Sequence, residues 1–467
     1  MNWEKNLFEE SILTKNDLPE EWRNQKTLDE FQDFLQANWE LRNTLFVDSY
    51  LTSKQQFISF TGSMGMRTNN YIGTIVYKNC KINIFPKVFK ENKNDFDTSR
   101  LSLKHLMANL RQWLEYCEKF SFKFVNISSE LDDCDDFREL LISIYLRYVD
   151  SALEVSPLFR YEERTSDLNV IRGKIDFNDY IRSKIPNGKY NELSCKYSEF
   201  EFDNMINRII KYTCKYVLDY TSSNENKRIV RNALYKLSDV KDIRCTAADC
   251  DGIRLNKLQS HYSIIVSMSK IFLLNQTNSF SIDDQESFCF LFPSEYLFEG
   301  FISGFMRDYL NNIADVSIQA NVDRLVDEIR YAGRSYQSAY EMRNDILINH
   351  PEKGLFVLDT KYKEIPRFDS GEDIRDSIVR SVKQSDLYQV TTYALKHGLS
   401  NVYLLYPLYR FEDEEPTGAE FVERFPDGTQ IGVHALRIPF VFENDEQKTK
   451  DILRNVIESI IEGTDTY

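Results

Sequence analysis

The stretch between residues 343 and 362 constrains the fold more than any other part of the sequence. Ile346 to Ile348 is apolar, residues 349–354 are turn formers, and residues 355–358 are apolar again. Strand-forming residues on both sides of a short turn predict a β-hairpin. Because Leu-Phe-Val-Leu leaves no polar face for solvent, the second strand is expected to lie inside a sheet.

Charged residues stand at the open end of this hairpin. Asp345 precedes the first apolar run, and Asp359 and Lys361 follow the second. Residues two apart on a strand point to one face, and hairpin pairing brings Asp345 close to Asp359. Two carboxylates hold Mg²⁺, with Mn²⁺ also compatible, and a lysine beside them stabilises charge on a phosphate. The alternative is a salt-bridge cluster, because short acid–x–lysine patterns recur by chance.

Two flanking segments contribute further candidate residues. Gln389 and Tyr393 are four residues apart in a helix predicted near 376–397, so they share a helix face. Glu299 lies at the edge of the apolar stripe of an earlier predicted helix, for which Ser294 is the candidate cap. A surface glutamine and a glutamate at the rim of the core are the structural alternatives.

The chain divides by pattern into three parts, as its length also suggests at roughly 150 residues per domain. Residues 1–96 predict a small β-rich domain, in which 61–70 is rich in Gly and Asn and predicts a mobile hairpin tip. That tip is either an ordinary loop or a loop offered to a partner. Residues 97–285 predict a mainly helical linker or assembly region, and residues 286–467 predict an α/β domain with a mixed sheet. The strands expected in the first part are 45–51, 56–60, 71–77 and 81–85.

Composition and charge narrow the functional classes. The net charge of −15 would repel DNA, so a role on DNA requires either a delivering partner or a local basic groove. The eight cysteines form no CxxC pair, which argues against a zinc or iron–sulfur site and against a disulfide framework. No apolar run approaches the roughly 20 residues of a membrane helix, and the N-terminus lacks a signal-peptide pattern. We therefore expect a cytoplasmic protein.

The hairpin resembles the signature of the PD-(D/E)XK nucleases. Asp345 is followed after a gap by Asp359, Thr360 and Lys361, and Asn344 stands where the signature often has Pro. The resemblance implies a restriction-endonuclease-like C-terminal domain within an α+β multidomain chain. It also implies a metal site at Asp345, Asp359 and Thr360. The Gln389-x-x-x-Tyr393 pair resembles an element that borders this active site, and Glu299 is placed where many such enzymes have a further acid. The implied catalytic residues are Asp345, Asp359, Lys361, Gln389 and Glu299.

Several segments in a fixed order are similar to the McrC subunits of McrBC-type restriction systems. They are 71–73, 82–87, 172–177, 200–211, 358–362 and 386–389. The resemblance implies a partner, a hexameric McrB-like AAA+ GTPase that recognises double-stranded DNA with modified bases, commonly methylcytosine. The McrC-like subunit would stimulate the GTPase and cut the DNA, with the loop near Arg67 as a candidate contact to the ring. The basic residues that could line a DNA groove are Arg343, Lys361, Lys363, Arg367, Arg375, Arg380 and Lys383.

The sequence is also compatible with two other functions. One is a stand-alone RecB-like nuclease, which would cut without GTP or a partner. The other is a non-catalytic activator of a ring NTPase with a vestigial nuclease domain. RecB-like nucleases often carry helicase domains or a cysteine-ligated cluster, and the sequence shows the pattern of neither. The presence of both acids and the lysine speaks against the non-catalytic activator.

Overall fold

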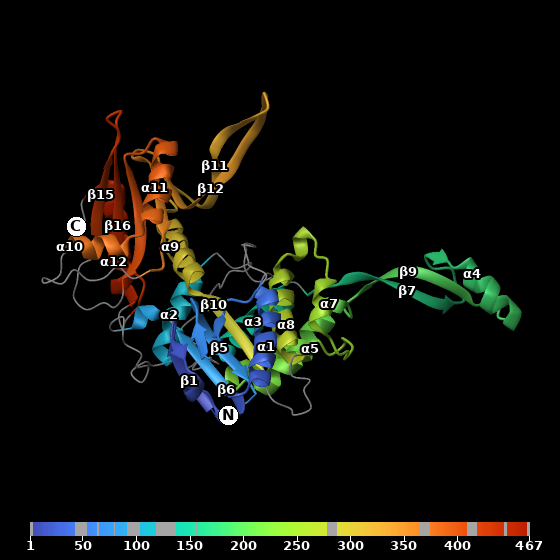
Figure 1. Cartoon of the computed structure of the whole chain (residues 1–467). Coiled ribbons are helices and arrows are strands. Elements are labelled where there is room, and N and C mark those ends of the chain that lie inside the picture. The colour runs from blue at the N-terminus through green and yellow to red at the C-terminus, as the bar shows by residue number, and fades with distance from the viewer. Residues whose placement is uncertain are drawn as a thin grey trace. The chain divides into compact units, whose positions relative to one another are not determined.

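The computed structural model forms two compact units, residues 1–137 with 288–467, and residues 138–287. It is an α+β multidomain chain with several separate sheets (Figure 1). Within its described residues, no helix is long and apolar enough to cross a membrane. The structure describes residues 3–42, 54–62, 65–78, 80–90, 103–117, 137–155, 157–277, 287–363, 374–408, 418–442 and 446–464.

The N-terminal part of the first unit contains two small sheets and one helix. The sheets have the orders β1-β6-β5-β10 and β2-β4-β3. Helix α1 was not expected from the sequence, and it packs large apolar residues such as Phe31 and Trp39 into the shared core. The strand expected at 45–51 lies outside the described residues, whereas those at 71–77 and 81–85 are confirmed. The elements are β1 (Trp3–Phe8), β2 (Ile12–Leu13), α1 (Gln25–Arg42), β3 (Ile58–Thr61), β4 (Gly65–Thr68), β5 (Tyr71–Tyr77) and β6 (Cys80–Phe85).

The segment 61–70 is not one long loop, because β4 lies within it. Met66 and Thr68 are buried while Arg67 between them is exposed, which is the alternation of a strand. Gly65 permits the close approach to β3, since a Cβ there would lie 2.5 Å from Thr61 Oγ1. Arg67 therefore lies on a paired strand and not at a hairpin tip.

Strand β10 (Phe288–Pro293) completes the N-terminal sheet, although it follows the second unit in sequence. It pairs antiparallel with β5 along its whole length. Gly73 makes this pairing possible, because its φ is 141° and a Cβ there would lie 2.2 Å from Phe290 O. Helix α9 (Ser294–Leu310) follows at once, and its N-cap is Pro293 rather than the expected Ser294. Residues 1–90 and the C-terminal part are thus joined by main-chain hydrogen bonds.

A six-stranded mixed sheet dominates the C-terminal part, in the order β11-β12-β13-β14-β16-β15. Val402, Leu404 and Tyr406 of β14 belong to the core under α11, while the Tyr403 hydroxyl donates to Ile460 O of α12. Helices therefore cover both faces of β14. The elements are β11 (Asp315–Tyr331), β12 (Arg334–His350), β13 (Gly354–Thr360), α10 (Ile374–Ser381), α11 (Gln384–His397), β14 (Asn401–Leu408), β15 (Gly418–Arg424), β16 (Gln430–Pro439) and α12 (Glu446–Glu462).

Helix α2 (Leu103–Tyr116) belongs to the first unit, although its sequence suggested the helical region. Trp113 stacks on Phe440 with ring centroids 4.2 Å apart, and its Nε1 donates to Phe440 O. Gly304 of α9 allows close packing, because a Cβ there would lie 1.8 Å from Tyr116 O. These contacts tie α2 to α9 and to the end of β16.

The second unit consists of helices and a three-stranded sheet in the order β7-β9-β8. Its helical part agrees with the pattern of the sequence, but the paired strands β7 and β9 were not expected, and they project from the helices of this unit (Figure 1). Helix α5 begins at Met205 with Asn204 as its N-cap. The elements are α3 (Phe137–Val155), β7 (Arg160–Leu168), β8 (Lys174–Ile175), α4 (Phe177–Asp179), β9 (Leu193–Glu201), α5 (Met205–Tyr220), α6 (Asn224–Lys236), α7 (Ala247–Asp251) and α8 (His261–Thr277).

Candidate active site

The register of β12 and β13 places two acids opposite each other. Ile346 pairs with Leu358 as the last pair of an antiparallel ladder, and Asp345 and Asp359 are the next residues of the two strands toward the open end. Asp359 is also paired with Leu404 of β14 on its other side. The hairpin predicted from the sequence is therefore present, and the two acids lie on adjacent strands in the middle of the sheet.

Asp345 is held by the residue that follows Asp359. Its Oδ2 accepts hydrogen bonds from the Thr360 main-chain N at 2.8 Å and from Thr360 Oγ1 at 2.9 Å. Two donors from one residue fix the orientation of the carboxylate. The contact ties the end of β13 to β12 beyond the last ladder pair.

The side chains of Lys361 and Gln389 both contact Asp359. The Lys361 ammonium lies 2.5 Å from Asp359 Oδ2, as an ion pair outside regular hydrogen-bond geometry. Lys361 also donates to Gln389 Oε1 at 3.2 Å, and Gln389 Nε2 donates to Asp359 Oδ1 at 3.3 Å. Gln389 Nε2 further contacts the Tyr393 hydroxyl at 2.7 Å, and Tyr393 donates to Arg343 O at 3.0 Å. The helix face predicted from the spacing of Gln389 and Tyr393 therefore faces the acid pair.

The electrostatics of the site favour a cation beside the acids. Burial and the charge of Asp345 raise the pKa of Asp359 to about 7, against the opposing effect of Lys361. Burial alone would lower the pKa of Lys361, but the charges of Asp359 and Asp345 outweigh burial and raise it. Lys361 is thus a fixed positive charge, and a further positive charge would stabilise the ionised form of Asp359.

Sequence comparison assigns most of this chain to one family. The family described as McrBC 5-methylcytosine restriction system component matches residues 66–407, more than half of the chain. The matched range contains Asp345, Asp359 and Lys361. The chain belongs to the McrBC family. Among curated proteins, no sequence matches it.

Solved structures resemble this McrBC family member at low sequence identity. One is a chain of the refined half-complex from the tetradecameric assembly of Thermococcus gammatolerans McrB AAA+ hexamers with bound McrC. It is 16% identical, with a TM-score of 0.61, and the match covers 98% of this chain and 100% of that chain. A chain of the Thermococcus gammatolerans McrBC complex is 16% identical with a TM-score of 0.45, covering 66% of this chain and 88% of that chain. The first likeness shows a shared fold.

Glu299 reaches the neighbourhood of the acids through the edge strand. Its carboxylate accepts a hydrogen bond from Gln319 Nε2 at 3.2 Å, and Gln319 Oε1 accepts from Arg343 at 2.8 Å. Gln319 lies between Ile318 and Ala320, which pair with Ile346 and Asn344 of β12, and it has a φ of 49°. The sequence did not identify Gln319 as a candidate, because neither the strained backbone of a glutamine nor its place on an edge strand produces a recognisable residue pattern.

The acid pair offers few side-chain ligands for a metal ion. Among the described residues, no group of three or more His, Cys, Asp or Glu side chains is arranged to hold a metal ion. The residues here that could hold a divalent cation are Asp345, Asp359 and Thr360, with water as a further ligand. Mg²⁺ tolerates such a set, because it commonly keeps several waters and takes one or two carboxylates.

The basic residues predicted for a groove differ in their surroundings. Lys363 pairs with the buried Asp386 at 2.7 Å on α11, and Arg343 is engaged by Gln319. Arg375 and Lys383 are exposed. Arg367 and the side chain of Arg380 lie outside the described residues.

The family-like segment at 172–177 lies at the β7–β9 hairpin of the second unit. The Arg172 guanidinium lies 4.2 Å from the Tyr197 ring centroid and 3.3 Å from Glu199 Oε1. Gly173 has a φ of 68°, and a Cβ there would lie 2.4 Å from Lys196 O. The local fold of the hairpin therefore accounts for the glycine at this position.

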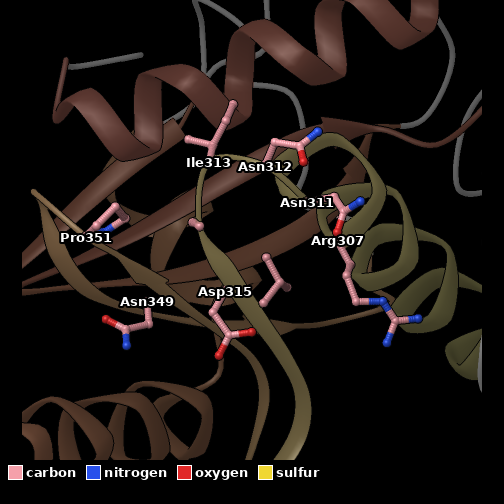
Figure 2. Close-up of a pocket in the computed structure, with 9 residues that line it drawn as sticks. Arg307, Asn311, Asn312, Ile313, Asp315, Asn349 and Pro351 are labelled. Carbon is pink, nitrogen blue, oxygen red and sulfur yellow. The ribbon is translucent and has the colours of Figure 1, made fainter.

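A pocket of about 540 Å³ lies at the other end of the β12–β13 hairpin (Figure 2). Its lining includes Asn311, Asn312, Asp315 and Asn349, and Asp315 pairs with Asn349 across β11 and β12. Asp315 is its single acidic side chain, so the pocket lacks the paired carboxylates that the open end of the hairpin provides.

Proposed function

We propose that this McrBC family member is the DNA-cleaving subunit of a modification-dependent restriction system. Its reaction is metal-assisted hydrolysis of phosphodiester bonds in double-stranded DNA that carries modified bases such as methylcytosine. The C-terminal part is a PD-(D/E)XK nuclease domain, and its chemistry is carried by Asp345, Asp359 and Lys361. The observation that carries the proposal is the position of the two acids just beyond the last pair of the β12–β13 ladder, linked through Thr360, with Lys361 beside them.

The chemistry of the donor set supports a divalent cation as cofactor. Asp359 is buried and lies beside a second acid, and both effects raise its pKa. A dication held by Asp345 and Asp359 would relieve that repulsion, so the residues present fit Mg²⁺ or Mn²⁺. When bound, the cation activates a water molecule and offsets charge on the phosphate.

The residues of the chain orient the reacting groups. Thr360 fixes the Asp345 carboxylate through two hydrogen bonds, and Gln389 fixes Asp359 and Lys361 together. Lys361 is positioned to donate to a phosphate oxygen as negative charge develops there. Its raised pKa keeps the amine protonated near neutral pH, which this role requires.

The partner in this proposal is an McrB-like AAA+ GTPase hexamer, which delivers the DNA and whose GTP hydrolysis this chain stimulates. A net charge of −15 disfavours independent capture of DNA, so delivery by a partner fits the composition. The similar Thermococcus gammatolerans structure contains McrB AAA+ hexamers with bound McrC. Arg67 is a weaker candidate for the ring contact than the sequence suggested, because it lies on β4.

Three variants of the full chain test the proposal, each mixed with an McrB-type GTPase, GTP, Mg²⁺ and a methylcytosine-containing plasmid. Lys361→Ala should slow cleavage by roughly 10²–10³-fold, the loss typical for one donor to a developing oxyanion. Asp359→Asn should abolish cleavage at every Mg²⁺ concentration. Both should stimulate GTP hydrolysis as the wild type does. Lys353→Ala, in the exposed turn of the same hairpin, is the matched control.

The outcomes separate the competing functions. Normal cleavage by Lys361→Ala would show that the site is wrongly assigned. Cleavage by the wild-type chain without GTP or a partner would favour a stand-alone nuclease. A wild type that stimulates the GTPase but never cuts, and does not differ from Asp359→Asn in a Mg²⁺ titration, would make it a non-catalytic activator.

A further inference from the structure

The chain makes a tight turn directly after the strand that carries Asp359. Lys361 N donates to Leu405 O at 2.8 Å, which extends the pairing with β14, and Lys363 N donates to Lys361 O at 2.8 Å. A hydrogen bond between residues two apart defines a γ-turn, with Tyr362 at its centre. The side chains of Lys361 and Lys363 reach Asp359 and Asp386, so the turn sets the position of both amines.

Tyr362 points away from these amines and into the core. Its side chain is buried, and its ring centroid lies 6.0 Å from that of Phe298 and 6.2 Å from that of Phe440. Its hydroxyl donates to Glu9 Oε2 at 2.9 Å. The hydroxyl thus links the centre of the turn to a residue 353 positions earlier in the chain.

Glu9 is fully buried and accepts from three separate elements. Besides Tyr362, the Lys87 main-chain N donates to its Oε2 at 2.8 Å, and the Ser294 hydroxyl donates to its Oε1. The Lys87 ammonium also lies 4.9 Å from the centroid of the Tyr362 ring. Burial raises the pKa of Glu9, whereas the charge of Lys87 and the three donors favour its ionised form.

We propose that Glu9 is a positioning residue for the nuclease site, acting through Tyr362 on the turn that presents Lys361. The inference rests on the proposed function, because it assigns Glu9 a part in the same reaction. The geometry has a functional consequence because catalysis is sensitive to small displacements. A shift of about 1 Å in a reacting group can cost roughly 10²-fold in rate.

Conservative variants of both partners test this proposal in the full chain. Tyr362→Phe removes only the hydroxyl and keeps the ring in the core, and Glu9→Gln keeps the size of the side chain. Tyr309→Phe is the matched control, since the Tyr309 hydroxyl donates to Glu458 on the surface, away from the turn. Cleavage is measured with the McrB-type GTPase, GTP, Mg²⁺ and methylated plasmid, and kcat and KM for DNA are determined separately.

A second readout is independent of cleavage and of metal. The full chain is labelled with limiting acetic anhydride, and the modification of Lys361 relative to the exposed Lys353 is measured by mass spectrometry. In the wild type the ion pair with Asp359 should protect Lys361. A general loss of stability would not change this ratio at temperatures well below unfolding.

We expect Tyr362→Phe and Glu9→Gln each to lower kcat about 10-fold or more, with KM for DNA nearly unchanged. Both should raise the labelling of Lys361 several-fold. The double variant should be no worse than the more affected single variant, because both changes break one connection. Tyr309→Phe should match the wild type in every measurement.

Wild-type kcat and labelling in Tyr362→Phe would overturn the inference, as would equal losses in the Tyr309→Phe control. These failures are distinguishable from failure of the proposed function. If Lys361→Ala abolishes cleavage while Tyr362→Phe does not, only the role of Glu9 is wrong. If Lys361→Ala cuts normally, the nuclease site itself is wrongly assigned.

Discussion

Gln389 connects the helix α11 to both charged groups of the candidate site. Its amide oxygen accepts from Lys361 and its amide nitrogen donates to Asp359, so one side chain fixes the distance between them. Tyr393, one turn later, contacts the same amide nitrogen and sets the orientation of the amide. Residues that support ligands or reacting groups in this way usually matter to activity.

Gln389→Ala should reduce DNA cleavage by roughly 10–100-fold, the range typical of residues that orient a metal site. The acids and Lys361 remain, but Lys361 and Asp359 lose the bridge between them. Initial rates at saturating GTP measure the effect. Gln384→Ala is the control, because Gln384 lies on the same helix, is exposed, and donates to the exposed Tyr388. Equal rates for both variants would remove Gln389 from the site.

Asp203 has a structural role at the start of helix α5. Its two carboxylate oxygens accept from Arg208 Nε at 2.7 Å and from an Arg208 terminal nitrogen at 2.8 Å, and Lys241 N adds a third bond. These hydrogen bonds lower the pKa of Asp203 to about 2 despite partial burial, and those from Arg208 have the largest effect. The residue braces the start of α5, while Asn204 caps it.

Asp203→Asn should lower the protection of α5 against hydrogen exchange, by about 1 kcal/mol once solvent screening is considered. Because the folded pKa lies below the unfolded value, this stabilisation is complete above about pH 4 and is lost as the pH falls toward 2. The difference between variant and wild type should therefore shrink from pH 5 to pH 3, after correction for intrinsic exchange rates. A difference independent of pH would contradict the assignment.

The residues foreseen from sequence are those whose partners are set by local geometry. Asp345 and Asp359 could be paired because a short turn fixes the hairpin register, and Gln389 and Tyr393 because four residues make one helical turn. Gln319 and Tyr362 could not be foreseen. Their partners, Glu299 and Glu9, lie on other elements, and no spacing rule connects them.

At the scale of elements, the helix pair α2 and α9 depends on one small residue. Gly304 faces the Tyr116 carbonyl so closely that a methyl group would lie 1.8 Å from its oxygen. Backbone atoms cannot move aside as a flexible side chain can. Any larger residue must therefore separate the two helices and disturb Trp113, which stacks on Phe440 near the end of β16.

Gly304→Ala should destabilise the first unit by about 1–3 kcal/mol, the usual cost of overpacking. Tryptophan fluorescence during urea unfolding measures this selectively, because all four tryptophans, at positions 3, 22, 39 and 113, lie in that unit. Gly62→Ala is the control, since nothing lies within 4 Å of a Cβ at Gly62. An unfolding midpoint equal to that of the control would mean that the helices tolerate the separation.

Element prediction succeeded where one face is apolar and failed where pairing is long-range. The apolar residues of α5 and α8 recur at helical spacing, because each helix buries a regular stripe of side chains, and this spacing is enough to predict a helix. Strand β10 was not recognisable as part of the N-terminal sheet, because its partner β5 lies more than 200 residues away. The strands β7 and β9 were missed because they contain many polar residues and no continuous buried stripe.

At the scale of the whole molecule, the first unit is built from both ends of the chain. Residues 1–137 and 288–467 cluster together, and residues 138–287 form a second unit inserted between them. Strand β10 and helix α9 follow the insertion directly and return the chain to the first unit. This arrangement makes the Glu9–Tyr362 contact possible, since it brings the N-terminal segment to the end of β13.

The two ways of dividing the chain predict different behaviour of fragments. A fragment of residues 137–287 contains one compact unit and should fold into a soluble, helical protein with a cooperative thermal transition. A fragment of 97–285, as the sequence pattern suggested, adds α2 without α9 or Phe440. Its apolar face would be left uncovered, including Leu110 and Trp113, which are fully buried in the structure.

Trp113 reports directly on this difference, because it is the single tryptophan in the 97–285 fragment. We expect its emission there to be shifted to the red of that of the full chain and to be quenched readily by iodide. The fragment should also aggregate through the uncovered face. If Trp113 instead emits as a buried indole in soluble 97–285, α2 packs stably without α9, and the boundary near residue 97 is the correct one.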